Sequence, residues 1–147
     1  MKTIKTLAIT LALLVYGASA VATDSTSQVI QRNAPKGITT TFYTCIDKAG
    51  TDTVAVGACL SAEKATQDAR LNTTYKALLS KLNDKAKGKL IIAERTWLKL
   101  QDENGEFENS LYGDEIIDNL DLAQNEIFSI CERANKLDRY LSIASNQ

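Results

Sequence analysis

The sequence predicts an all-α fold: an antiparallel three-helix bundle, stapled by a disulfide and preceded by an extended, partly disordered N-terminal arm. Two observations carry this prediction. Apolar residues recur at steps of three and four through three separate segments after residue 60. The one segment with strand propensity, residues 38–43, is short and has no second strand with which to pair.

Residues 1–20 have the pattern of a cleaved secretory signal peptide. Two lysines come first, residues 7–16 are an apolar stretch too short to span a bilayer, and residues 18–20 read Ala-Ser-Ala, an A-x-A cleavage site. We therefore expect a periplasmic or secreted protein that is not inserted in a membrane after cleavage. Loss of the two lysines lowers the formal net charge from −1 to −3, which argues against a nucleic-acid partner.

Residues 21–44 are predicted to form a flexible leader before a folded domain at residues 45–147. The leader is rich in Thr, Ser, Gln and Asn and contains the only proline, Pro35. Residues 38–43 are expected to pack as its extended arm.

The first long helix is expected to begin at Ser61, which is a suitable N-cap residue. Its apolar stripe repeats at steps of four and three. The stripe consists of Leu71, Tyr75, Leu78 and Leu82.

The second helix is expected to be capped by Asp84 and to end near Gly105. The residues that it should turn inward are Leu90, Ala93, Trp97 and Leu100.

The third helix has the clearest pattern in the chain, an unbroken seam with heptad spacing. The seam consists of Ile116, Leu120, Ala123, Ile127, Ile130, Ala134, Leu137 and Leu141. One amphipathic helix cannot bury itself, so the two helices before it should cover this seam in a monomer. A coiled-coil dimer through the same seam is the alternative.

Two carboxylates, Asp68 and Glu94, fall on the apolar stripes of the first and second helices. A buried carboxylate needs partners, which could come from three arginines, the Trp97 indole and the Tyr75 hydroxyl. The arginines are Arg95, Arg133 and Arg139. We interpret the pair as a structural polar network, because catalytic carboxylates belong in a cleft. A deep pocket around both would favour catalysis instead.

The composition gives little support for an enzymatic function. The chain has no histidine, and it shows neither a nucleophile elbow nor a cluster of metal ligands. We therefore predict that it is not an enzyme, that it has no catalytic residue, and that it needs no metal or cofactor.

Three segments together resemble the lysozyme inhibitor LprI-like family of bacterial envelope proteins. They are Asp68-x-x-Leu71-Asn72-x-x-Tyr75-x-x-Leu78, Leu90-x-x-Ala93-Glu94-x-x-Trp97-x-x-x-x-Asp102, and Cys131 followed after seven residues by Arg139. The second segment departs from the family pattern, with Glu94 in place of glutamine, Leu100 in place of an aromatic residue and Gln101 in place of arginine. The resemblance implies a helical, disulfide-bonded envelope protein, in some members an inhibitor of lysozyme.

The resemblance also bears on the disulfide. Gly105 stands where the family has a cysteine, so the partner of that cysteine should be left free. In an antiparallel pair the start of the first helix lies beside the end of the second, which makes Cys59 that partner. We therefore favour a Cys45–Cys131 disulfide, with Cys45–Cys59 as the alternative.

Charge is divided along the chain, and residues 101–132 contain no base. The acidic region should attract a cationic protein, and many lysozymes are strongly cationic. The predicted partner-binding residues are Asp102, Glu103, Glu106, Phe107, Glu108 and Tyr112. The alternative is a non-catalytic structural or interaction module of the cell envelope with no lysozyme target. Exposed aromatic residues here would favour the inhibitor, and buried ones the module.

Overall fold

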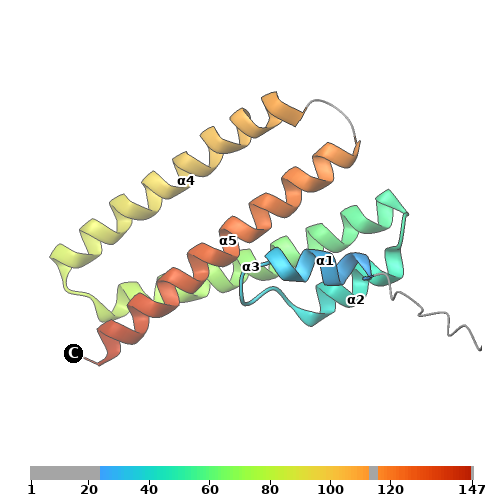
Figure 1. The fold of residues 1–147 in the computed structure, drawn as a ribbon. Coiled ribbons are helices and arrows are strands. Elements are labelled where there is room, and N and C mark those ends of the chain that lie inside the picture. The colour runs from blue at the N-terminus through green and yellow to red at the C-terminus, as the bar shows by residue number, and fades with distance from the viewer. Residues whose placement is uncertain (1–23, 113–115, 147) are drawn as a thin grey trace, which may run out of the picture.

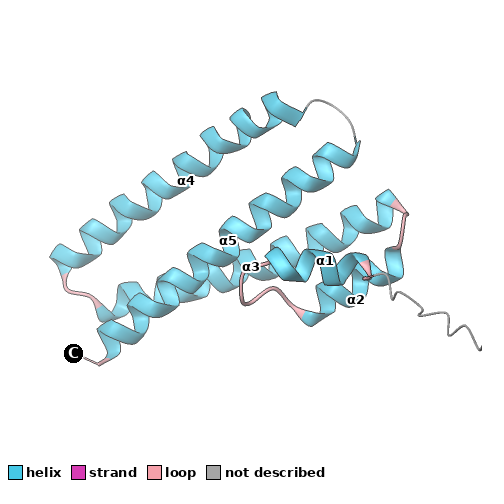
Figure 2. Cartoon of the chain, viewed as in Figure 1, coloured by secondary structure: helices cyan, strands magenta, loops and turns pink. Residues whose placement is uncertain are grey.

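The structure, a computed structural model, describes residues 24–112 and 116–146. This part of the chain contains the helices α1 (Thr26–Asn33), α2 (Thr40–Ala49), α3 (Thr53–Lys81), α4 (Asp84–Tyr112) and α5 (Ile116–Ser145) and no strand, as Figures 1 and 2 show. The prediction of an all-α fold is confirmed, although the predicted count of three helices is incomplete. The predicted signal peptide lies outside the described residues. No described helix is long and apolar enough to cross a membrane.

The helices α3 and α5 form the centre of the molecule. They run in the same direction, because Lys64 contacts Glu126 near one end and Thr74 contacts Asp138 further along. The predicted seam of α5 faces this contact. Its middle residues are almost fully buried: Ile127, Ile130, Ala134 and Leu137. The middle of the seam is thus covered within the chain by α3.

Two apolar clusters are built on this pair. At one end α2 completes a cluster made up of Ile38, Phe42, Ile46, Cys59, Leu60, Ile127 and Cys131. At the other end α4 completes a cluster made up of Leu71, Leu78, Leu90, Ile130, Ala134 and Leu137. The short helices and α4 therefore attach to opposite ends of α3 and α5.

The prediction of a flexible leader and extended arm is wrong for residues 24–44. The N-cap of α2 is Thr39, whose hydroxyl accepts the Phe42 N–H at 3.1 Å. Buried Glu63 of α3 then accepts both the Thr39 N–H at 3.0 Å and the Thr39 hydroxyl at 2.5 Å. Phe42 and Ile46 are buried against α3 and α5. A segment with polar composition is folded because α3 supplies a carboxylate for its cap.

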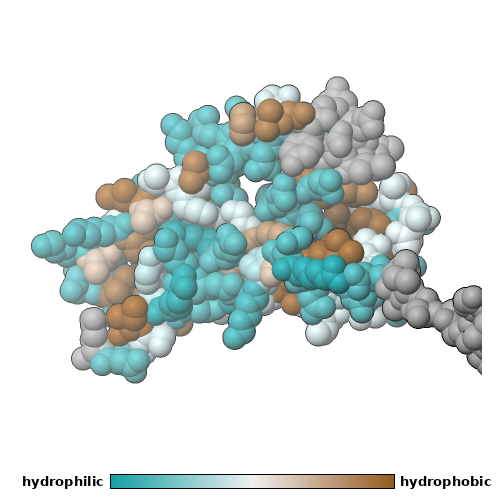
Figure 3. Space-filling model, viewed as in Figure 1, coloured by the Kyte–Doolittle hydropathy of each residue, from teal (hydrophilic) through white to brown (hydrophobic). Residues whose placement is uncertain are grey.

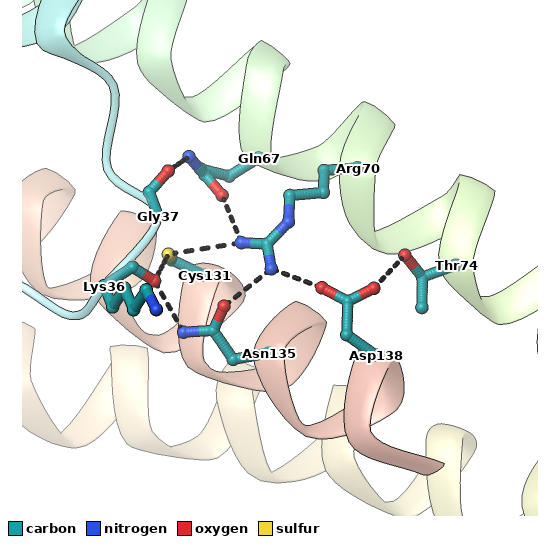
Figure 4. A network of polar contacts seen from close by, with 8 residues as sticks. All are labelled: Lys36, Gly37, Gln67, Arg70, Thr74, Cys131, Asn135 and Asp138. Atoms are coloured by element: carbon teal, nitrogen blue, oxygen red, sulfur yellow. Dashed lines mark hydrogen bonds and ion pairs between the residues drawn. The ribbon is translucent and has the colours of Figure 1, made fainter. Parts of the chain in front are cut away.

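The connection between α1 and α2 is fixed to the bundle through two backbone carbonyls (Figure 4). The Gly37 carbonyl accepts a hydrogen bond from Nε2 of Gln67 at 2.9 Å. The Lys36 carbonyl accepts one from Nδ2 of Asn135 at 2.7 Å and one from the Cys131 thiol at 3.5 Å. These bonds link residues about 30 and 95 positions apart, so they hold the connection in a single place.

Arg70 of α3 lies at the middle of this network (Figure 4). Its guanidinium donates to Oδ1 of Asn135 at 2.6 Å, pairs with Asp138, and lies 3.7 Å from the Cys131 sulfur. Gly37 has a φ of +114°, and a Cβ there would lie 2.6 Å from the guanidinium. Both the backbone angle and the close approach of Arg70 therefore require glycine at this position.

Three predicted helix boundaries are also wrong. The helix α3 begins eight residues before Ser61, because Asp52 caps it by accepting the N–H groups of Val54 and Ala55. Ser61 lies inside the helix, where its hydroxyl donates to a backbone carbonyl. The helix α4 is capped by Asn83, which accepts the Ala86 N–H at 3.0 Å, and not by Asp84, and it continues through Gly105 to Tyr112.

The disulfide joins Cys45 of α2 to Cys59 of α3, so the favoured Cys45–Cys131 pairing is wrong and the alternative pairing is present. The start of α3 is covered by α2, and not by the end of α4 as the prediction assumed. A side chain at Gly105 would meet no atom within 4 Å. Cys131 is the free cysteine, and it is buried.

Replacement of Cys45 or Cys59 by alanine should lower the free energy of unfolding by about 3 kcal/mol, because either change opens the same short loop in the unfolded chain. Urea denaturation of the two variants measures this loss. Alkylation of the unfolded, unreduced wild-type protein should label Cys131 alone. Labelling of Cys59 would contradict the pairing.

Candidate functional site

The predicted partner-binding residues belong to the last turns of α4 rather than to a loop. We call residues 101–111 the acidic segment of α4. Asp102, Glu103 and Glu106 are exposed, and Glu108 is half-buried. Phe107 is 61 % exposed, whereas the side chain of Tyr112 lies outside the described part of the chain. Because Phe107 is exposed and not buried in the bundle, this part of α4 favours the inhibitor over the structural module.

The orientation of α4 follows from the residues that it turns toward α5. At the start of the helix these are apolar or paired, and further along they are polar. The inward-facing series consists of Leu90, Glu94, Trp97, Gln101 and Glu108. Successive members are three, four or seven residues apart, and each side chain is buried or half-buried. Beyond Trp97 no large apolar side chain of α4 joins a core cluster of the described residues.

An open groove lies between the acidic segment and α5, with a volume of about 580 Å³. Its α4 side includes Asp102, Glu106 and Glu108, and its α5 side includes Leu122 and Glu126. Because polar residues of α4 face α5 here, the two helices are not drawn together by apolar contact. The acidic segment is therefore accessible from more than one side.

On the flank that adjoins this inward side, α4 presents apolar residues to solvent. We call Leu100, Phe107 and Leu111 the outer face of α4; they are 53 %, 61 % and 64 % exposed. Figure 3 shows apolar atoms gathered toward the C-terminal end of this helix. The expectation that Leu100 points inward is wrong, and so is that for Ala93, which is exposed. Glu94, held by α5, takes the inward position and rotates both residues outward.

Leu111 was also expected as a possible anchor, whereas Leu100 was missing from the predicted binding residues. The signal for Leu100 in the sequence is a second series at heptad spacing, formed by Ala86, Ala93, Leu100 and Phe107. A helix with two such series cannot bury both when it contacts the rest of the chain along one side.

The acidic segment carries an unbalanced charge. Its four carboxylates make no ion pair among the described residues, and residues 101–111 contain no lysine or arginine. An exposed apolar face beside uncompensated acids is suited to a partner that is both basic and apolar.

Four residues of the first sequence motif and Glu94 of the second lie together at another groove, between α3 and α4. This motif groove has a volume of about 460 Å³. Its lining comprises Asp68, Leu71, Asn72 and Tyr75 of α3, and Ile91, Glu94, Arg95 and Leu98 of α4. The first motif thus contributes to a surface as well as to the core, and the second motif contributes Glu94.

The expected structural network is present only around Glu94. Its Oε2 accepts two hydrogen bonds from Arg133 of α5, at 3.0 and 2.7 Å, and both side chains are only 10 % exposed. The guanidinium carbon of Arg133 lies 5.6 Å from the centre of the Trp97 ring, a cation–π distance. The ion pair and the indole together anchor the first half of α4 to α5.

Neither Asp68 nor the predicted partner Arg139 joins this network, and neither does the motif residue Asp102. Asp68 is half-buried and pairs with Lys64 at 3.0 Å. Asp102 and Arg139 are exposed and make no ion pair among the described residues. Because the motif groove is lined by two carboxylates that are each held by a cation, it has the character of a binding surface rather than of an acid–base centre.

Replacement of Glu94 by alanine should lower the free energy of unfolding by about 3 kcal/mol, because Arg133 would keep a buried charge without a partner. Asp68→Ala should cost no more than about 1 kcal/mol, because its pair with Lys64 is more than one-third exposed. Urea denaturation of both variants makes the comparison. Equal losses would show that Glu94 does not anchor α4.

A family model described as lysozyme inhibitor LprI matches residues 45–141. The match spans α3, α4 and most of α5, together with the second half of α2. No curated protein and no solved structure matches the chain. Because the matched segment is well over half of the chain, this protein belongs to the LprI lysozyme inhibitor family.

Proposed function

We propose that this member of the LprI family binds a lysozyme without covalent chemistry and blocks it, with the outer face and the acidic segment of α4 as the contact surface. The observation that carries the proposal is Phe107, an exposed aromatic side chain with Leu111 one turn later and uncompensated acids around both. The family name supplies the kind of target, and the geometry of α4 supports the place of contact.

The outer face has the composition of an interface centre. A few large apolar or aromatic anchors commonly provide most of the binding free energy, and polar residues around them exclude water. Phe107 and Leu111 lie one turn apart on one side of α4, so both can enter a single cleft of a partner. Glu103 and Glu106 are near them in sequence and would form the polar rim.

The acids direct the choice of partner. Four carboxylates within seven residues create a negative potential that accelerates encounter with a cationic protein and slows encounter with an acidic one. A strongly cationic lysozyme fits this field. We also propose that the protein is exported, acts outside the cytoplasm as a monomer, and is not an enzyme.

The alternative, an envelope module without a lysozyme target, receives less support. That alternative predicts burial of the aromatic residues that follow Gly105, whereas Phe107 is exposed. An interaction module would also need a partner for the outer face of α4. A test must therefore identify the contact surface as well as the inhibition of lysozyme.

Inhibition should be measured with the purified mature protein in a cell-wall lysis assay, against a panel of lysozymes at low and moderate salt. We expect inhibition of the more cationic enzymes, weakening with salt because exposed charges are screened. The double variant Glu103→Lys/Glu106→Lys should weaken inhibition at low salt and remove most of its salt dependence. Glu132→Lys, a change to an exposed glutamate of α5, is the control and should behave as wild type. Inhibition that ignores both charge and salt would contradict the acidic segment as the contact.

Phe107→Ala should weaken inhibition by at least about thirtyfold, since removal of an aromatic anchor usually costs about 2 kcal/mol or more of binding free energy. Its control is Val54→Ala, another exposed apolar side chain, at the start of α3 and 82 % exposed. Titration of each variant into the lysis assay gives the ratio of inhibition constants. Equal effects of the two substitutions on inhibition would exclude the outer face as the contact surface. If the wild-type protein dimerises with rising concentration and Phe107→Ala abolishes the dimer, the outer face binds a second copy of this chain instead.

A further inference from the structure

The motif groove is formed by two helical faces that confront each other. Its residues on α3 and its residues on α4 both follow the spacing i, i+3, i+4, i+7, which places each set on one side of its helix. The two helices share the turn at residues 82–83 and diverge from it in Figure 1, so the space between them is not closed by direct packing.

The groove has a buried floor and an exposed rim. Leu71 and Glu94 are 7 % and 8 % exposed and form the floor, with Arg133 of α5 holding the carboxylate from behind. Asn72 and Arg95 are exposed on opposite sides, one from each helix. A molecule that enters between the rim residues therefore reaches a fixed carboxylate.

Several polar atoms that line the groove have no protein partner among the described residues. Arg133 binds only Oε2 of Glu94, and Lys64 binds only Oδ2 of Asp68, which leaves one carboxylate oxygen of each. Oδ1 of Asn72 and the Tyr75 hydroxyl make no hydrogen bond within the described chain. No such side-chain atom is sealed from solvent, so water or a ligand can reach all of them.

The balance of charge selects against an ionic ligand. The charge of Glu94 is matched by Arg133, whereas the single charge of Lys64 is shared by Asp68 and Glu126. Arg95 offsets the carboxylate charge that is left over and supplies donors, so the groove favours neither a cation nor an anion. A ligand that fits must therefore donate to several oxygens, accept from a guanidinium, and carry no charge of its own.

Hydroxyl groups meet this requirement, because each one both donates and accepts a hydrogen bond. The apolar walls, Ile91 and Leu98 of α4 with the ring of Tyr75 of α3, suit the C–H faces of a sugar ring. We propose that the motif groove binds a short neutral oligosaccharide. This inference does not rest on the inhibition of lysozyme, since it concerns another surface and another ligand.

The test is a titration of the ¹⁵N-labelled mature protein with the trimer of N-acetylglucosamine, followed by amide chemical shifts. No lysozyme is present, so a failure here leaves the proposed function intact. We expect shifts concentrated at residues 68–75 and 91–98, with a dissociation constant on the order of 1 mM, because few groups contribute and the groove is open. Absence of shifts at millimolar trimer, or shifts centred on the acidic segment, would overturn the proposal.

Two pairs of variants make the test specific. Asn72→Ala and Tyr75→Phe each remove hydrogen-bonding atoms of the groove and should weaken binding about fivefold. Their controls are Asn119→Ala and Tyr140→Phe, the same changes at exposed positions of α5, which should bind as wild type. Equal weakening by the controls would contradict the site. A titration with free arginine gives a further check. The same shifts at a lower concentration of arginine would contradict the proposal, because the groove would then be a site for cations.

Discussion

The contact between α3 and α5 is the interaction on which the rest of the molecule depends. Each of the two apolar clusters contains residues from both helices, so neither cluster exists until this pair has formed. Arg70 then couples the pair to the chain that precedes it, through Asn135 and Asp138 on one helix turn and the connection beside Gly37. A guanidinium with several fixed donors can serve all these acceptors at once, which a lysine could not.

The helix α4 is attached differently along its length. Leu90 and the Glu94–Arg133–Trp97 contact fix its first half, and beyond them the residues that face α5 are polar. The same rotation that buries Glu94 turns the outer face to solvent. One buried ion pair therefore has two effects: it positions the acidic segment away from the core, and it forms the floor of the motif groove.

The sequence was sufficient where apolar spacing alone determines packing. The seam of α5 and the stripe that contains Leu71 and Leu78 are where their periodicity placed them. Periodicity failed on α4, because two series compete there and an ion pair with Arg133 decides between them. It also failed before residue 45, where the helix begins through a hydrogen bond between Thr39 and Glu63, 24 positions away. Of the site residues, Phe107 was predictable from charge and aromatic content. The groove that joins the first motif to Glu94 was not predictable, because it depends on the angle at which α3 and α4 diverge.

The buried thiol of Cys131 has a consequence for how the protein matures. In the unfolded, reduced chain, any two of the three cysteines can be oxidised together, and a thiolate can also attack a disulfide already formed. Docking of α5 removes this freedom, because Cys131 then lies under the connection beside Lys36, and burial raises the pKa of its thiol although Arg70 opposes the effect. Chains in which α5 docks before oxidation therefore retain a single possible crosslink, whereas chains in which Cys131 has already formed a disulfide must be reshuffled before they can fold.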